Sequence, residues 1–347
     1  MTGHGNGLEA AFERQLAGTP SGEVRLVGGG GEDGEAAKVL HRFAGKDGQP
    51  VETTLDPRVQ EAAEAALDPL TKPAALVALR PSTGELLAVV NSPVDGYNRA
   101  LLGRYPPGST FKVVTAGALL ASGLRPTDPV DCPKEAKVGG RTFGNFEDEV
   151  LGRIPFSSAF AHSCNTAFVQ QAAKRLDGEE LVAAAAQYGF GLDPSPSIPA
   201  VTSRVPAPSD RADLAAESFG QGRVTASPLQ MALVAGTVAK GRWPHPTLVS
   251  GETGETESPD PLDAKVASTL RTLMRQVVTE GTAADANLPG KVGGKTGTAE
   301  FGTGDPLPTH AWFIGFRGDL AFSVVVEDGG VGGRVAAPTA ARFLRGL

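Results

Sequence analysis

The sequence predicts an α+β fold, in which an antiparallel sheet of about five strands is flanked by helices and carries an inserted all-helical subdomain. Short apolar runs typical of strands occur early in the chain, at 74–80 and 85–90, and again near its end, at 311–316 and 320–327. The long interval between them is dominated by helical periodicity. The strand runs are almost continuously apolar, so we expect helices on both faces of the sheet. One sheet is therefore assembled from pieces that are distant in sequence.

Composition places the chain among globular proteins and excludes several function classes. Its 347 residues, 40% apolar and 20% charged, suffice for one large or two ordinary domains. Because the net charge is −7 and no block of Lys or Arg occurs, we expect no nucleic-acid partner. No stretch approaches the roughly 18 apolar residues of a membrane-spanning helix, and the amino terminus lacks the regions of a signal peptide. We therefore expect either a cytoplasmic protein or the soluble part of a longer one.

Neither the histidines nor the cysteines indicate a metal site or a disulfide framework. The five histidines show no metal-ligand spacing, so we expect no metal and no other cofactor. Cys132 and Cys164 are the two cysteines of a long chain, and we expect both to be reduced thiols.

Residues 1–50 differ from the rest and are predicted to be a linker or the remnant of a preceding module. A short helical piece at 8–16 is followed by two candidate strands, 23–27 and 38–43, on either side of a glycine-rich tract at 28–34.

Residues 51–347 are predicted to form the main domain. Its sheet should come from 51–104 and 286–347, and its helical subdomain from roughly 105–285. The first helix begins at Pro57, after the N-cap residue Asp56, and should end near residue 67.

The rest of this domain has sequence patterns typical of a hairpin, of loops and of helices. The early proline and late glycine of residues 81–84 are typical of a hairpin turn between the first two strands. The Gly- and Asp-rich stretch 127–152 is predicted to be surface loops, and 189–217 has no strong period. The predicted helices of the interval and the carboxyl terminus are 155–161, 166–175, 179–188, 228–240, 263–280 and 336–344.

A sharp turn and a helix place a serine beside a lysine. The turn Pro106-Pro107-Gly108 cannot continue a helix or a strand, so a helix should start directly after it, with Ser109 on its first turn. Free backbone N–H groups and the positive end of the helix dipole favour developing negative charge there. Lys112 lies three residues further on and shares a face with Ser109. This is the Ser-x-x-Lys pairing of acyl-transfer enzymes, in which the amine can take the serine proton.

Two further patterns follow in order along the chain. Ser163-Cys164-Asn165 stands between two predicted helices, and Lys295-Thr296-Gly297-Thr298 stands on a predicted edge strand. Each pattern alone has a plain explanation, since Ser109 could be a simple N-cap and Ser163 and Asn165 could cap a loop. Together, in this order and these settings, they match the S-x-x-K, S-x-N and K-T-G set of penicillin-recognising serine enzymes.

On these residues the chain resembles the penicillin-binding proteins, specifically the transpeptidase domain of the class B type. Residues 219–222 with 225–232 are similar to that family's G-Q-G…T-P-L-Q-M-A signature. Residues 78–85 resemble its V-A-L-D-P-x-T-G-E hairpin, and 310–315 the strand that follows K-T-G. The resemblance covers roughly residues 51–347 and includes no glycosyltransferase module of the class A type.

Physical roles and the resemblance agree on the catalytic residues. Ser109 would attack a carbonyl and form an acyl-enzyme, with Lys112 as its base. The pKa of Lys112 must then fall from about 10.4 toward neutrality, and both burial and Lys295 would lower it. Ser163 would relay a proton between the two lysines and the leaving amine, and the Asn165 amide would hold Lys112 and the substrate.

The remaining expected roles concern binding. Backbone N–H groups of Ser109 and Thr298 would form the oxyanion hole. Lys295, Thr296 and Thr298 would receive the terminal carboxylate of the substrate, and Gly297 would leave room for a substrate lying along the strand edge. Five apolar side chains are assigned to packing, namely Phe111, Val113, Val114, Trp312 and Phe313.

These expectations describe a peptidoglycan D,D-transpeptidase that cross-links D-Ala-D-Ala stem peptides and is acylated by β-lactams. The alternatives are a D,D-carboxypeptidase or class D-like β-lactamase on the same scaffold, or a non-catalytic β-lactam sensor or division scaffold. The resemblance implies a place outside the cytoplasmic membrane, with an anchor and any contact to cell-wall or division proteins supplied by a region ahead of this chain.

Overall fold

The computed structural model describes residues 7–26, 38–251, 258–304 and 306–347. The chain divides into two compact units. The N-terminal unit comprises residues up to Thr53 with 249–252, and the main unit comprises 54–248 and 253–347. The glycine-rich tract predicted at 28–34 lies outside the described residues.

The N-terminal unit is a pair of short helices and a strand pair. Helices α1 (Leu8–Ala11) and α2 (Glu13–Ala17) replace the single helical piece expected there. Strands β1 (Gly22–Leu26) and β2 (Lys38–Phe43) pair antiparallel, which confirms the two predicted strands. The side chains of both strands are almost all exposed.

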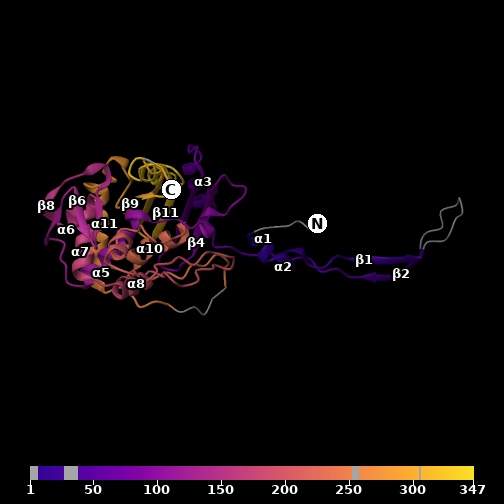
Figure 1. The fold of residues 1–347 in the computed structure, drawn as a ribbon. Helices are drawn as coiled ribbons and strands as arrows, with labels where there is room; N and C mark the ends of the chain where they lie inside the picture. The colour runs from indigo at the N-terminus through magenta and orange to yellow at the C-terminus, as the bar shows by residue number, and fades with distance from the viewer. Residues whose placement is uncertain (1–6, 27–37, 252–257, 305) are drawn as a thin grey trace. The chain divides into compact units, whose positions relative to one another are not determined.

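Five antiparallel strands form the sheet of the main unit, in the spatial order β4-β3-β11-β10-β9. Figure 1 labels β4, β11 and β9 of this sheet. Their bounds are Ala74–Leu79 for β3, Leu86–Ser92 for β4, Gly293–Glu300 for β9, Thr309–Arg317 for β10 and Leu320–Val326 for β11. The early hairpin β3–β4 pairs with the late strand β11, so the sheet joins sequence-distant pieces as predicted. Strand β9, which carries Lys295 to Thr298, lies at the edge.

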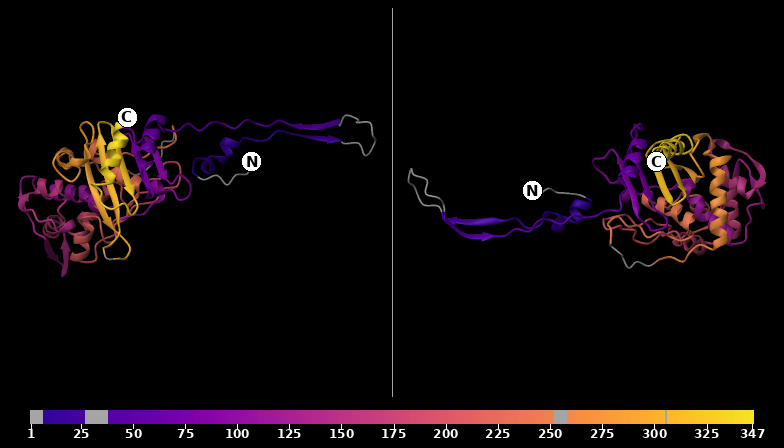
Figure 2. Two further views of the ribbon diagram at one scale, coloured as in Figure 1. Left: turned by 90° about the horizontal axis from the view of Figure 1, so that it is seen from above. Right: turned by 180° about the vertical axis from the view of Figure 1, so that it is seen from behind.

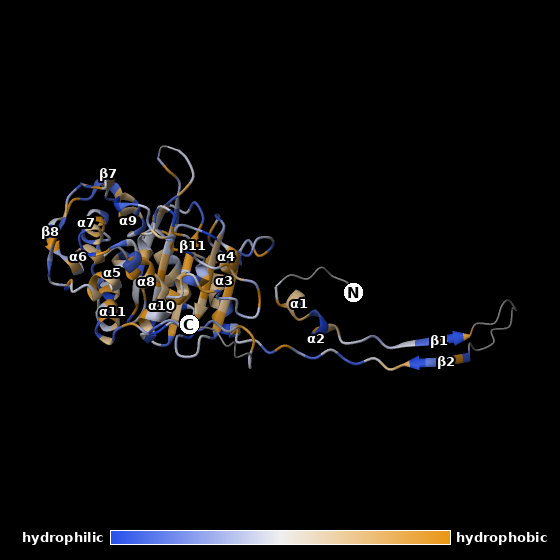
Figure 3. Ribbon diagram, turned by 60° about the horizontal axis from the view of Figure 1, so that its bottom comes forward, coloured by the Kyte–Doolittle hydropathy of each residue, from blue (hydrophilic) through white to orange (hydrophobic). Residues whose placement is uncertain are grey.

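Helices cover both faces of this sheet, and the alternation of side chains along β11 separates the two faces. Ser323 Oγ donates a hydrogen bond to the carbonyl of Pro228 (2.6 Å) at the start of α10 (Pro228–Lys240). The neighbouring Phe322 packs its ring against Phe343 of α12 (Ala336–Arg345), with centroids 5.5 Å apart. Figure 2 shows α12, in yellow, against the sheet, and Figure 3 shows apolar colour along central strands such as β11. The strands are therefore buried on both sides, as their continuous apolar character predicts.

Helix α3 (Pro57–Leu67) shares a face of the sheet with α12. The Asp56 side chain accepts a hydrogen bond from Arg58 N and Pro57 occupies the first turn, so the predicted cap and start are confirmed. The Arg342 guanidinium of α12 donates to the carbonyl of Ala66 (2.9 Å), which joins the two helices.

The interval between the early and late strands contains helices, as predicted, but it is not all helical. Its remaining helices are α4 (Arg99–Leu102), α5 (Lys112–Ala121), α6 (Phe156–Ala161), α7 (Asn165–Arg175), α8 (Gly178–Ala186), α9 (Arg211–Glu217) and α11 (Ala264–Thr279). The stretch 127–152, predicted to be loops, contains three short strands, and a fourth begins at its last residue. They form two pairs, β5 (Pro129–Cys132) with β8 (Gly152–Pro155) and β6 (Glu135–Val138) with β7 (Arg141–Gly144). Helix α9 lies within the stretch that has no strong period in sequence.

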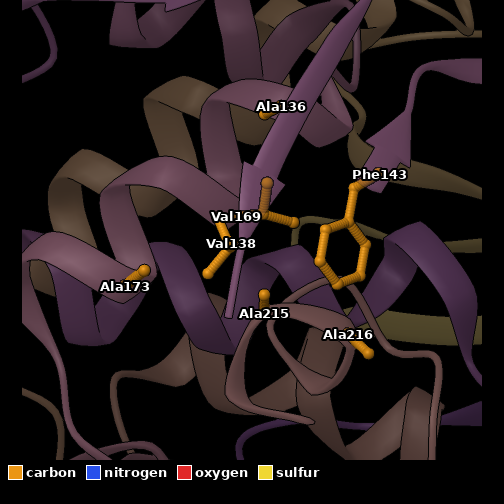
Figure 4. Close-up of a cluster of buried hydrophobic side chains, with 7 residues drawn as sticks. All are labelled: Ala136, Val138, Phe143, Val169, Ala173, Ala215 and Ala216. Atoms are coloured by element: carbon orange, nitrogen blue, oxygen red, sulfur yellow. The ribbon is translucent and has the colours of Figure 1, made fainter. Parts of the chain in front are cut away.

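These short strands owe their formation to packing against helices. Alternate residues of β6 are buried, and together with Phe143 of β7 they form a small core with α7 and α9. Figure 4 shows this cluster, which consists of Ala136, Val138, Phe143, Val169, Ala173, Ala215 and Ala216. Four-residue strands rich in polar residues have weak local signals, and long-range contacts decide their conformation.

The two cysteines form a disulfide, contrary to the expectation of reduced thiols. Cys132 at the end of β5 is bonded to Cys164, with Cα atoms 6.2 Å apart. Two cysteines separated by 32 residues carry no pairing signal in sequence, but the packing of β5 against α7 brings them together.

Candidate active site

The turn that carries Ser109 is a short 3₁₀ helix, Gly108–Phe111, which leads directly into α5 at Lys112. Gly108 has a positive φ of 54°, and its N–H donates to the carbonyl of Gly220 (2.9 Å). Gly220 in turn has a φ of +77°, and a Cβ there would lie 2.2 Å from Gly108 O. The G-Q-G segment therefore supports the serine turn from behind, and glycine is required at this contact.

Lys112 is completely buried, and its ammonium group contacts the second motif. Its Nζ donates to Ser163 O (2.6 Å), Ser163 Oγ (3.2 Å) and Asn165 Oδ1 (2.6 Å), and it lies over the Phe168 ring. Burial, followed by the nearby charge of Lys295, holds the pKa of Lys112 well below its ordinary value. This is the direction, and these are the two causes, expected from the sequence.

Ser163 and Asn165 are held in place at the junction of α6 and α7. Ser163 has a φ of 62°, which is uncommon for a residue other than glycine, and Cys164 Sγ caps α7 by accepting from Ala167 N (3.3 Å). Asn165 Nδ2 donates to Gly144 O (3.1 Å) of β7. The disulfide thus lies between the two polar residues of this motif and ties them to β5.

The third motif lies on β9, and its side chains have two different environments. Thr296 and Thr298 line a cleft, where Thr298 Oγ1 accepts from Gly332 N (3.1 Å). Lys295 is completely buried near the Phe160 ring, and desolvation lowers its pKa to about 7. In this conformation Lys295 does not line the cleft and therefore affects the site through its charge.

The structure gives a different reason for the glycine at position 297 from the one expected. A Cβ at this position would lie 2.9 Å from Thr110 Cγ2 and 3.0 Å from both Pro107 O and Trp312 Cβ. The missing side chain thus makes room for the serine turn against β9, rather than for a molecule along the strand edge. Trp312 and Phe313 are fully buried, as predicted, and Trp312 Nε1 donates to Pro106 O (3.2 Å).

A cleft of about 960 Å³ joins the motifs. Ser109, Ser163, Asn165, Thr296 and Thr298 all line it. A half-buried serine hydroxyl, a buried amine of lowered pKa and an edge strand that lines the cleft are the components of a serine acyl-transfer site.

Sequence reasoning missed Asn145, which connects several parts of the site. Its Nδ2 donates to Pro133 O and Glu149 O (both 2.8 Å), and its Oδ1 accepts from Thr166 N (3.0 Å). It stands in the polar stretch predicted to be loops, where no periodic or motif signal marks it. Cys132 was missed as a partner of the second motif for the same reason.

The comparisons with known proteins agree with this geometry. The sequence model of the penicillin binding protein transpeptidase domain matches residues 74–345. The chain belongs to this family. It is 36% identical to the peptidoglycan D,D-transpeptidase PbpA of Mycolicibacterium smegmatis, a match that covers 96% of this chain and 77% of that protein.

Solved penicillin-binding proteins have the same fold. The ceftriaxone acyl-enzyme complex of penicillin-binding protein A from M. tuberculosis has a TM-score of 0.78 at 31% identity, covering 87% of this chain and 80% of that one. The D,D-transpeptidase domain of a peptidoglycan glycosyltransferase from Eggerthella lenta has a TM-score of 0.81 at 26% identity, covering 100% and 88%. The fold class predicted from the sequence is confirmed.

Proposed function

We propose that this penicillin-binding protein is a peptidoglycan D,D-transpeptidase that cross-links stem peptides through a serine acyl-enzyme and is acylated by β-lactams. The observation that carries the proposal is the buried amine of Lys112, three residues after Ser109. This amine has a lowered pKa and is hydrogen-bonded to Ser163 and Asn165. Its relatives include proteins named D,D-transpeptidases and a structure captured as a β-lactam acyl-enzyme.

In the proposed first step, Ser109 Oγ attacks the carbonyl of the penultimate D-Ala while Lys112, uncharged, takes the hydroxyl proton. Backbone N–H groups of Ser109 and Thr298 bind the developing oxyanion. The peptide C–N bond then breaks, and the proton passes through Ser163 to the departing D-Ala. A Ser109 ester of the donor stem remains.

In the proposed second step, the amine of another stem attacks this ester, its proton goes to Lys112 and then to Ser109 Oγ, and the ester bond breaks. Before acylation, Thr296 and Thr298, both in the cleft, bind the terminal carboxylate of the donor, which leaves with the departing D-Ala, and Lys295 adds positive potential from beneath. Asn165 orients Lys112 and the donor peptide group, and the Gly297 backbone lies beside the donor on the edge strand.

The proposal extends to the setting of the enzyme. We assign residues 51–347 to the transpeptidase domain and 1–50 to the end of a preceding linker or pedestal. No helix in the described part of the chain is long and apolar enough to cross a membrane. The substrate is extracytoplasmic, so the proposed location is the outer side of the cytoplasmic membrane, and the proposed partners include cell-wall or division proteins.

The test is intact-protein mass spectrometry after addition of benzylpenicillin, with Ser109→Ala as the control. A stable adduct on Ser109 that lasts for hours supports a penicillin-binding protein. Rapid loss of the adduct with drug turnover would indicate a β-lactamase, and labelling that persists in Ser109→Ala would overturn the assignment of the nucleophile. Incubation with a D-Ala-D-Ala donor and an amine acceptor then separates a transpeptidase, which forms a cross-linked product, from a carboxypeptidase or a sensor.

A further inference from the structure

Four carboxylates line the cleft, and one of them has a distinctive place. They are Glu147, Glu149, Asp285 and Glu300. Glu147 is neutralised by Arg334, which makes two hydrogen bonds to it (2.9 and 3.1 Å). Within the described ranges of the chain, Glu149 has no ion-pair partner, although it is partly buried.

The backbone at Glu149 is tied to the catalytic motif. The Asn145 amide donates to Glu149 O (2.8 Å) and to Thr166 Oγ1 (3.2 Å), while its oxygen accepts from Thr166 N (3.0 Å). Thr166 directly follows Asn165 at the start of α7. Because the Cys132–Cys164 disulfide closes the same segment, Glu149 is carried on a loop that is held beside the second motif.

The charge of Glu149 reaches the catalytic base. Glu149 raises the pKa of Lys112, against the larger lowering effects of burial and Lys295. Glu149 also lines the same cleft as Ser109 and Ser163. Its carboxylate can therefore hold a second cation within the cleft that contains the serine.

We propose that Glu149 binds the ammonium group of the acceptor stem and positions it for attack on the Ser109 ester. This inference rests on the proposed function and deepens it. The bound ammonium first passes one proton to uncharged Lys112. The neutral nitrogen forms the new C–N bond, the bond from the carbonyl to Ser109 Oγ breaks, and the Lys112 proton goes to Ser109 Oγ. The second proton lost by nitrogen leaves to solvent. Water needs no such ion contact, so Glu149 favours aminolysis over hydrolysis.

The test compares Glu149→Gln with the parent chain and with Glu179→Gln, a matched loss of charge at an exposed residue of α8 outside the cleft. Each protein is acylated by a D-alanyl thioester donor and supplied with a peptide that bears a free lysine amine, and the ratio of cross-linked to hydrolysed product is measured. We expect Glu149→Gln to lower this ratio about tenfold, the scale of one hydrogen bond to a charged group. Glu179→Gln should leave the ratio unchanged.

Two further measurements distinguish a role of Glu149 in binding the acceptor from a structural role. Acylation of Glu149→Gln by benzylpenicillin should keep the parent yield, since that step needs no acceptor. Hydroxylamine, which is uncharged at neutral pH, should intercept the ester equally well in the variant and the parent. An unchanged ratio with the lysine peptide, or an equal fall with hydroxylamine, would overturn the role of Glu149. If the parent chain is not acylated at all, the proposed function itself fails.

Discussion

Loss of the Cys132–Cys164 disulfide should destabilise the main unit and impair acylation together. The bond closes a loop of 32 residues. In the chain-entropy relation, a loop of this size restricts the unfolded state by about 3.7 kcal/mol. For a unit of this size, an unfolding entropy of about 2.1 cal/mol/K per residue means that each kcal/mol changes Tm by about 1.6 °C, so we expect a loss of roughly 6 °C. Acylation should slow as well, because the crosslink ties Cys164, which stands between Ser163 and Asn165, to β5.

The assay is thermal unfolding of the parent chain and of the Cys132→Ser/Cys164→Ser variant, each with and without a reductant. Serine can still cap α7, so the comparison isolates the crosslink. The reductant should lower the Tm of the parent chain to that of the variant and leave the variant unchanged. If the denatured parent chain labels fully with iodoacetamide before reduction, or if its Tm does not respond to reductant, the reasoning is refuted.

Three other changes test the charges and contacts of the site. The acylation rate with benzylpenicillin should fall when the pH drops below the lowered pKa of Lys112, because only uncharged Lys112 can accept the serine proton in the proposed mechanism; a rate that stays constant down to the lowest pH at which the chain remains folded would contradict this role. Lys295 has a folded pKa of about 7 against an ordinary 10.5, so the unfolded chain binds more protons between these values and stability rises with pH there. Burying the Lys295 ammonium group lowers the free energy of unfolding by about 5 kcal/mol at neutral pH, and Lys295→Met should remove this loss, raise Tm and abolish acylation. A lower Tm in this variant would argue against a destabilising buried charge at position 295. Gly220→Ala should reduce acylation at least about a hundredfold by displacing the turn whose Ser109 N–H is proposed as half of the oxyanion hole. Gly123→Ala, at another positive φ but with open space around its Cβ, should leave acylation intact, and equal effects of the two changes would refute the steric argument.

Much of the fold could be predicted because its signals are local. The Asp56 cap and Pro57 start define α3 through one hydrogen bond and one restricted φ. Strands β3, β4, β10 and β11 are continuous apolar runs, which are stable only when covered on both faces. Four-residue strands such as β5 to β8 have no comparable pattern, so the prediction of loops at 127–152 was wrong.

The sequence by itself determined the chemistry of this protein: the order of its three motifs, the turn that exposes Ser109, and the amine three residues further along. These features depend on neighbouring residues, whose spacing is set by proline geometry and helical pitch. Only the tertiary structure decided that Cys132 meets Cys164, that Asn145 joins Glu149 to α7, and that Gly297 faces the serine turn. Such contacts join residues far apart in the chain, and they arise from the packing of β5 to β7 on α7 and of β9 on the serine turn, which no local pattern encodes.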